Sequence, residues 1–110
     1  MVWRMTDYLQ VSTTTANREA GMSLIRSAVG ARLAASGQVV GPAGAAFRYL
    51  EELGTGEEWQ VFLRTTSDRY AELEAHLIEH HSWDNPEVTY TRIDGGSAAY
   101  LQWLKRETSP

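Results

Sequence analysis

The stretch HHSWDNPE, residues 80–87, marks the point where a helical pattern gives way to an extended one. Apolar residues recur at helical spacing before it, and Pro86 forces the residue that precedes it out of the helical region. Residues 88–91 are then β-branched or aromatic, as is typical of a short strand. A turn at residues 94–96 and a second aromatic stretch, YLQWL at residues 100–104, follow. The last third of the chain therefore predicts a helix, a strand and a final helix.

Strand and helix patterns also alternate before that stretch. Residues 8–14 alternate with period two, which predicts a strand. Asn17 is the predicted N-cap of an amphipathic helix that runs to Ala35, with Gly37 as its stop. An extended segment at residues 38–53 follows. Glycine and proline interrupt it at residues 41–44, and residues 54–56 are the predicted hairpin turn.

The next elements are predicted from the same kinds of signal. Residues 58–66 carry apolar side chains on both faces, which indicates a central strand. Thr66 or Ser67 is the expected cap of a helix that ends near His81, and Ser97 is the expected cap of the last helix. The side chains predicted to be buried by these two helices are Tyr70, Leu73, Leu77 and Ile78 in one and Tyr100, Leu101 and Leu104 in the other.

This order of elements is β-α-β-β-α-β plus a terminal helix, which predicts an α+β, ferredoxin-like fold with an antiparallel sheet. Two helices would cover one face of the sheet. In so short a chain, self-association is the usual way to cover the other face. The length of 110 residues suits one domain over residues 1–110, with its core at about 8–104.

Composition narrows the possible partners. A net charge of −4 and scattered basic residues argue against nucleic acid as a partner. No segment is apolar enough to predict a membrane span, and residues 1–4 lack the apolar core of a signal peptide, so a cytoplasmic location is expected. The absence of cysteine excludes disulfides and thiolate metal ligands.

Four short motifs resemble those of the CutA family, the divalent-cation tolerance proteins. Residues 80–87 are similar to its His-Pro-Tyr-x-x-Pro-Glu segment, and residues 100–104 to its Tyr-Leu-x-Trp helix. Residues 32–35, Arg-Leu-Ala-Ala, and 63–66, Leu-Arg-Thr-Thr, resemble a helix end and a strand end of that family. The resemblance implies a homotrimer related to the PII signalling proteins that binds a small molecule or a cation.

The chain also departs from the family pattern. Ser36 stands where the family usually has cysteine, Thr13 stands where some members have another, and Ser82-Trp83 replaces Pro-Tyr. Without thiolates there is no basis for selecting Cu(I). The chain therefore resembles a divergent member of the family.

The resemblance suggests a ligand cleft between subunits. His81 matches a family histidine, and Arg64 and Glu58 match family positions on a strand. Imidazole titrates near neutrality, so His81 is suited to carry a proton or to hold an anion. The alternative is structural, with His81 bonded to the last carbonyls of its helix and an indole packed at the subunit interface. The predicted cleft residues are His81, Trp83, Arg64, Glu58 and Asn85.

A separate pair, His76 and His80, stands four residues apart on the second predicted helix. This spacing places two imidazoles one turn apart, where they could share a divalent cation. The alternative is an exposed polar face. Motifs for catalysis are missing from the sequence. Three functions therefore stay open: a trimeric binding protein, a trimeric enzyme on the same scaffold, or a PII-like sensor.

Overall fold

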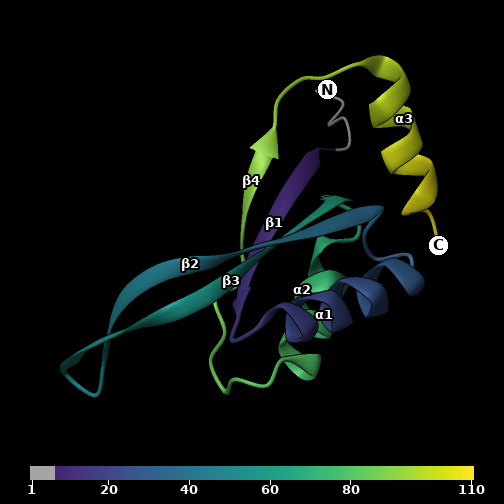
Figure 1. Cartoon of the computed structure of the whole chain (residues 1–110). Coiled ribbons are helices and arrows are strands. Elements are labelled where there is room, and N and C mark those ends of the chain that lie inside the picture. Colours follow the sequence, from purple (N-terminus) through teal and green to yellow (C-terminus); the bar gives the residue numbers. More distant parts are fainter. Residues whose placement is uncertain (1–6) are drawn as a thin grey trace.

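The computed structural model describes residues 7–110 and shows a four-stranded sheet with three helices (Figure 1). The sheet is antiparallel, with strand order β2-β3-β1-β4. The predicted ferredoxin-like α+β fold is confirmed. The elements are β1 (Tyr8–Thr15), α1 (Arg18–Gly30), β2 (Ser36–Tyr49), β3 (Glu52–Thr66), α2 (Tyr70–His80), β4 (Thr89–Ile93) and α3 (Ala98–Glu107). Residues 1–4, which were judged from the sequence to lack the apolar core of a signal peptide, lie outside the described residues.

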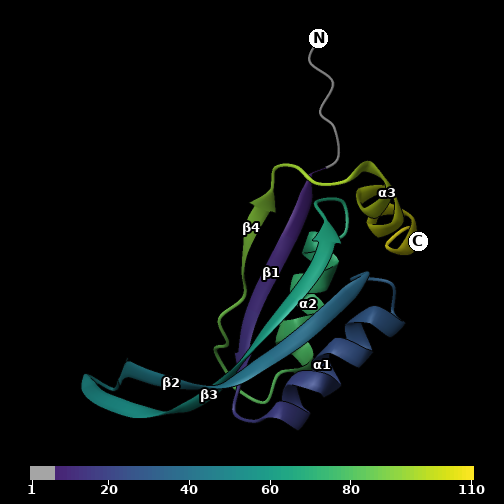
Figure 2. The same cartoon turned by 45° about the horizontal axis from the view of Figure 1, so that its top comes forward.

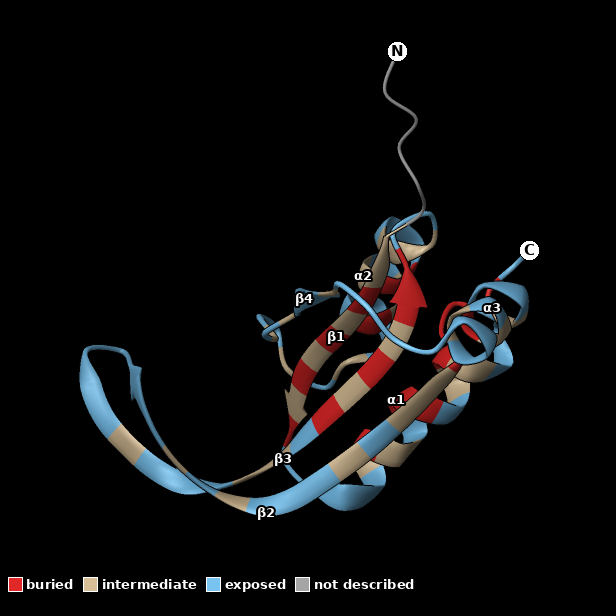
Figure 3. Cartoon of the chain, turned by 90° about the horizontal axis from the view of Figure 1, so that it is seen from above, coloured by how far each residue is buried: buried red, intermediate tan, exposed pale blue. Residues whose placement is uncertain are grey.

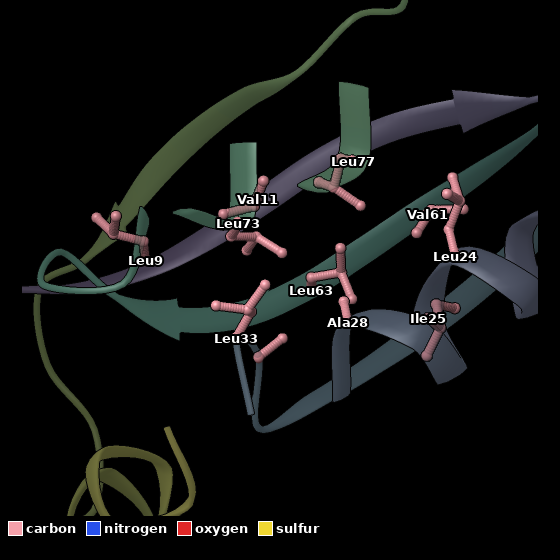
Figure 4. Packing of buried hydrophobic residues seen from close by; sticks show 11 residues of the cluster. Leu9, Val11, Leu24, Ile25, Ala28, Leu33, Val61, Leu63, Leu73 and Leu77 are labelled. Carbon is pink, nitrogen blue, oxygen red and sulfur yellow. The ribbon is translucent and has the colours of Figure 1, made fainter. Parts of the chain in front are cut away.

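The core lies between the sheet and the pair α1 and α2, which cover one face (Figures 1 and 2). Alternate residues of β1 and β3 point into it, because successive side chains of a strand point to opposite faces. Helix α2 adds Leu73 and Leu77, both fully buried. Figure 4 shows the side chains of this core gathered between the sheet and the helices: Leu9, Val11, Leu24, Ile25, Ala28, Leu33, Val61, Leu63, Leu73 and Leu77.

Strands β2 and β3 continue far beyond the helices as a curved hairpin, which we call the arm, residues 41–59 (Figure 2). It gives the molecule a length of 50 Å. The arm is exposed over most of its length (Figure 3), and its tip carries large apolar side chains: Tyr49 is 70%, Leu50 79% and Leu53 75% exposed.

The hairpin turn was predicted at the wrong residues. It lies at Leu50 and Glu51, whose φ angles of 51° and 66° are those of the tight turns that match strand twist. Gly54 and Gly56 instead lie inside β3, paired with Phe47 and Ala45. Gly54 has a packing role, since a Cβ there would collide with the ring of Phe47.

The predicted interruption at residues 41–44 is a local irregularity within a continuous strand. The register of β2 against β3 shifts between Val40 and Ala43, and the Gly41–Pro42 peptide is cis. Strand β3 lies between β2 and β1, so its predicted central position is confirmed.

Helix α1 begins as predicted but ends five residues early. The Asn17 side chain accepts a hydrogen bond from the Ala20 amide at 2.8 Å. At the other end Arg32 adopts φ 61°, while the amides of Arg32 and Leu33 donate to the carbonyls of Val29 and Ala28, as in a Schellman motif. Arg32 occupies the position usually taken by glycine.

The Arg32 side chain also bonds to the end of α3. Its Nε donates to the Ser109 carbonyl at 2.9 Å, and its Nη2 donates to the Arg106 carbonyl at 3.0 Å. A cation is favourable there because the last carbonyls of a helix carry partial negative charge. The contact holds α3 near the start of β2 (Figure 1).

Three further predictions about helices need correction. The N-cap of helix α2 is Arg69, which makes no side-chain cap, so neither Thr66 nor Ser67 caps the helix; the Ser67 hydroxyl accepts the Asp7 amide instead. Ile78 is 48% exposed rather than buried. Tyr100 is 41% exposed, although Leu104 of the same helix is fully buried. The predicted cap Ser97 is confirmed by its bond to the Tyr100 amide.

Candidate ligand sites around the exit of helix α2

His81, directly after α2, is anchored within the subunit through both ring nitrogens. Its Nε2 lies 2.7 Å from the carbonyl oxygen of Thr14 on β1, and its Nδ1 accepts the Trp83 amide at 3.0 Å. A carbonyl only accepts and an amide only donates, so the ring carries its proton on Nε2 and is neutral. The predicted bond from His81 to the last carbonyls of α2 is therefore wrong, since the carbonyl bonded is that of Thr14 on β1. The packing of the Trp83 indole at a subunit interface stays a prediction.

Trp83 and Asn85 follow in the loop that leads to β4. The Trp83 ring lies against the imidazole of His81, with ring centroids 5.1 Å apart. Trp83 is half-buried and Asn85 is exposed. This loop is held to the end of β1 by His81, and it lies where the arm begins, because Thr14 pairs with Gln60 of β3.

Arg64 and Glu58 share the sheet face that points away from α1 and α2, but they are far apart. They lie six residues apart on β3, which at about 3.3 Å per residue corresponds to ~20 Å. The Arg64 Nη2 donates to the Gln38 side chain at 3.0 Å. One subunit alone therefore does not bring Arg64 and Glu58 together, and their convergence with His81 stays a prediction about the assembly.

The two histidines of α2 stack on each other, and each is hydrogen-bonded within the chain. The rings of His76 and His80 have centroids 4.1 Å apart. His76 Nε2 lies 2.7 Å from the Ser27 hydroxyl of α1, and His80 Nδ1 donates to the His76 carbonyl at 2.8 Å. Burial lowers the pKa of His76 below its ordinary value of 6.5; the charge of His80 lowers it further, whereas Glu79 opposes the shift.

These residues do not form a complete metal site. One nitrogen of each imidazole is bonded within the chain, and Glu72, one turn earlier, is paired with Arg69 at 3.0 Å. Over residues 7–110 no three histidine, aspartate or glutamate side chains are placed to hold a metal ion together. The His76–His80 pair stays a prediction, and the structure adds no third ligand to it.

A hollow of about 260 Å³ lies beside this pair, between α1 and the residues that follow α2. We call it the serine-histidine hollow. It was not predicted from the sequence, although the four-residue spacing of Ser23 and Ser27 on α1 signals one polar helix face. Its lining consists of Thr15, Ala20, Ser23, Leu24, Ser27, His80, His81 and Ser82.

A second hollow of about 160 Å³ lies at the opposite end of β1, next to Tyr70 and Tyr90. Burial, together with the hydrogen bond that its hydroxyl donates to Glu74 at 2.7 Å, raises the pKa of Tyr70 to about 12. Asp7 and Arg92, also in its wall, form an ion pair at 2.9 Å. The charged groups here are paired with each other, so this hollow has little to offer a charged ligand.

The fold and these sites define a small α+β protein with a projecting hairpin arm and a histidine-rich exit from its second helix. Residues 9–107 match the family model described as CutA1 divalent ion tolerance protein. The chain belongs to this family.

Known members of the family are similar to this chain in sequence. Protein CutA, chloroplastic, of Arabidopsis thaliana is 34% identical over 98 residues, which cover 89% of this chain and 54% of that protein. The chain thus spans about half the length of this plant relative. The divalent-cation tolerance protein CutA of Thermus thermophilus is 26% identical, with 89% of this chain and 95% of that protein covered.

Solved structures of the family superpose closely on the chain. CutA1 from Oryza sativa has a TM-score of 0.90 at 30% identity, covering 94% of both chains. The divalent cation tolerance protein from Thermus thermophilus has a TM-score of 0.87 at 25% identity, covering 96% of this chain and all of the other. Within residues 7–110 no helix combines the length and the apolar character needed to cross a membrane.

Proposed function

We propose that this chain acts as a homotrimer that binds a small polar ligand in clefts between its subunits. The observation that supports this proposal best is the arm. Its tip exposes Tyr49, Leu50 and Leu53 by 70% or more, and no other part of the described chain covers them. Large apolar side chains exposed to this extent are costly to leave in water, and a neighbouring subunit packed against the arm would cover them.

The proposed cleft draws on residues that one subunit keeps apart. His81, Trp83 and Asn85 lie where the arm begins, while Arg64 lies toward the other end of β3. A neighbouring subunit laid against the open sheet face would supply the missing wall, and ligand sites favour such junctions. The guanidinium of Arg64 would then face a polar or anionic ligand beside the Trp83 indole.

The oligomeric state is the first test. Light scattering on the chain at micromolar concentration is expected to give three times the subunit mass. The change Leu53→Glu at the arm should shift the mass toward the monomer, whereas Glu57→Gln, also in the arm, should not. A monomer mass for the unaltered chain would refute the proposal.

A second test concerns the cleft itself, with inorganic phosphate as the anionic probe. Arg64→Gln is expected to weaken phosphate binding in calorimetry while the trimer persists, because the bond of Arg64 to Gln38 lies at the surface, where such bonds add little to stability. Arg48→Gln, a change to an exposed arginine of the arm, serves as the matched control. Equal phosphate binding by both variants and the unaltered chain would remove Arg64 from the site.

Cation binding is proposed only as a weak property that depends on histidine. Soft thiolate ligands are missing, so Cu(I) has no preferred donors, and divalent ions would bind through His76 and His80. Calorimetry with Cu(II) should show weak binding that disappears in a variant with His76, His80 and His81 all replaced. Tight Cu(I) binding that survives that replacement would contradict this proposal.

A further inference from the structure

The serine-histidine hollow lies within one subunit, between α1, the end of β1 and residues 80–82. Ser23 and Ser27 lie one turn apart on α1, and His80, His81 and Ser82 close the other side. Its volume of about 260 Å³ has room for several water molecules, and therefore for a small organic molecule in their place.

The hydrogen bonds around the hollow determine which groups remain for a ligand. His80 must carry a proton on Nδ1, because that atom lies 2.8 Å from the His76 carbonyl, which can only accept. In the neutral ring Nε2 of His80 is then an acceptor, and no protein group among the described residues bonds to it. His81 has no nitrogen to spare, and the Thr15 hydroxyl is bonded to the Asn17 carbonyl at 2.9 Å.

The serine hydroxyls are the other groups in the hollow that a ligand could bond to. Ser23 and Ser82 are exposed at the rim, their hydroxyls have no hydrogen bond to the described part of the protein, and each can both donate and accept. Ser27 is held at 2.7 Å from His76, which fixes its oxygen in the wall. Leu24 and Ala20 add an apolar patch on the same side.

The residue types that line the hollow favour a neutral ligand over a charged one. Among the described residues that line the hollow there is no aspartate, glutamate, lysine or arginine. With the His80 ring neutral, a charged ligand would lose hydration here without gaining a counter-charge, which is costly. A neutral molecule whose hydroxyls both donate and accept would match the three serines and His80, and its carbon skeleton would lie on Leu24.

We propose that the serine-histidine hollow binds a neutral polyol of monosaccharide size, with Ser23, Ser82 and the Nε2 atom of His80 as its main hydrogen-bonding partners. The lining shares His81 with the proposed cleft, but both ring nitrogens of His81 are bonded within the chain, so the polyol would be held by Ser23, Ser82 and His80 instead. Binding in the hollow does not require the trimer, so either proposal can fail without the other.

Titration of isotope-labelled protein with D-glucose, followed by amide resonances, tests the site. Binding in the millimolar range is expected, with the largest shifts at residues 20–27 and 80–82. Ser23→Ala combined with Ser82→Ala, and separately His80→Phe, should each weaken binding about three- to tenfold, the effect of one or two lost hydrogen bonds. Ser109→Ala, an exposed serine outside the hollow, should bind glucose like the unaltered chain.

Sodium acetate at the same concentrations is the charged counterpart of the probe. It is expected to shift the resonances of residues 20–27 and 80–82 little. The proposal is overturned if glucose causes no localised shifts, if acetate binds at these residues as well as glucose does, or if the hollow variants bind glucose unchanged.

Discussion

The Oγ atom of Ser27 and the Nε2 atom of His76 lie 2.7 Å apart, and this hydrogen bond joins α1 to α2 in the layer of helices. The two residues are 49 positions apart in the sequence. The bond fixes the wall of the serine-histidine hollow and places His80 one turn beyond it. The same hydrogen bond therefore contributes both to the packing of α1 against α2 and to the shape of the candidate site.

The first prediction concerns the strength of this bond. Ser27→Ala should lower the free energy of unfolding by about 1 kcal/mol, because it leaves a partly buried imidazole nitrogen without a partner. A double-mutant cycle with His76→Phe, measured by urea unfolding at one protein concentration, should give a coupling of similar size. Strictly additive effects would show that the bond contributes nothing.

The second prediction concerns how the stability of the protein changes at acid pH. The folded protein lowers the pKa of His76 below 6.5, so the unfolded chain binds this proton more readily. The stabilisation from neutral His76 is complete above the unfolded value and is lost as the pH falls through the folded value. His76→Gln should therefore lose less stability than the unaltered chain as the pH falls below 6.5. Parallel stability profiles for the two proteins in urea unfolding would contradict this.

The third prediction uses two glycines of one strand. Gly54→Ala should destabilise the protein by about 1 kcal/mol, the low end for overpacking, because the Phe47 ring that must move is 43% exposed. Gly56→Ala is the control, since nothing lies within 4 Å of the added methyl group. Thermal unfolding should separate the two variants, and equal melting temperatures would show that the ring moves aside freely.

The fourth prediction concerns the tip of the arm. Glu51 has φ 66°, a conformation that costs an ordinary residue about 1–2 kcal/mol. Glu51→Gly should therefore raise the melting temperature, while Glu52→Gly, at the start of the strand, should lower it. If Glu51→Gly lowers the melting temperature instead, the Glu51 side chain makes contacts that a single subunit does not show.

The same tip shows where sequence reasoning failed. Glycines at residues 54–56 predicted the turn, yet Leu50 and Glu51 make it, because β2 and β3 pair along their full length and determine where the chain reverses. Arg32 likewise ends α1 in a glycine-like conformation that its own contacts with α3 support. Neither conformation is favoured by local sequence, and both depend on residues distant in the chain.

Features set by neighbouring residues were predicted well. The caps Asn17 and Ser97, the order of elements and the central position of β3 follow from local pattern, and the structure confirms them. The candidate site was harder to predict from the sequence, because its geometry depends on contacts between residues that are distant in the chain. The partner of His81 is Thr14, 67 residues away, and no local pattern indicates that bond.

Arg32 also has a consequence for how the protein opens. Its guanidinium holds the carbonyls of Arg106 and Ser109, so α3 cannot detach without breaking a contact at the end of α1. The two helix ends should then open as one cooperative unit, and their amides should exchange with solvent deuterium at a common free energy. Arg32→Ala would separate them, so that the amides of α3 exchange quickly while those of α1 stay protected.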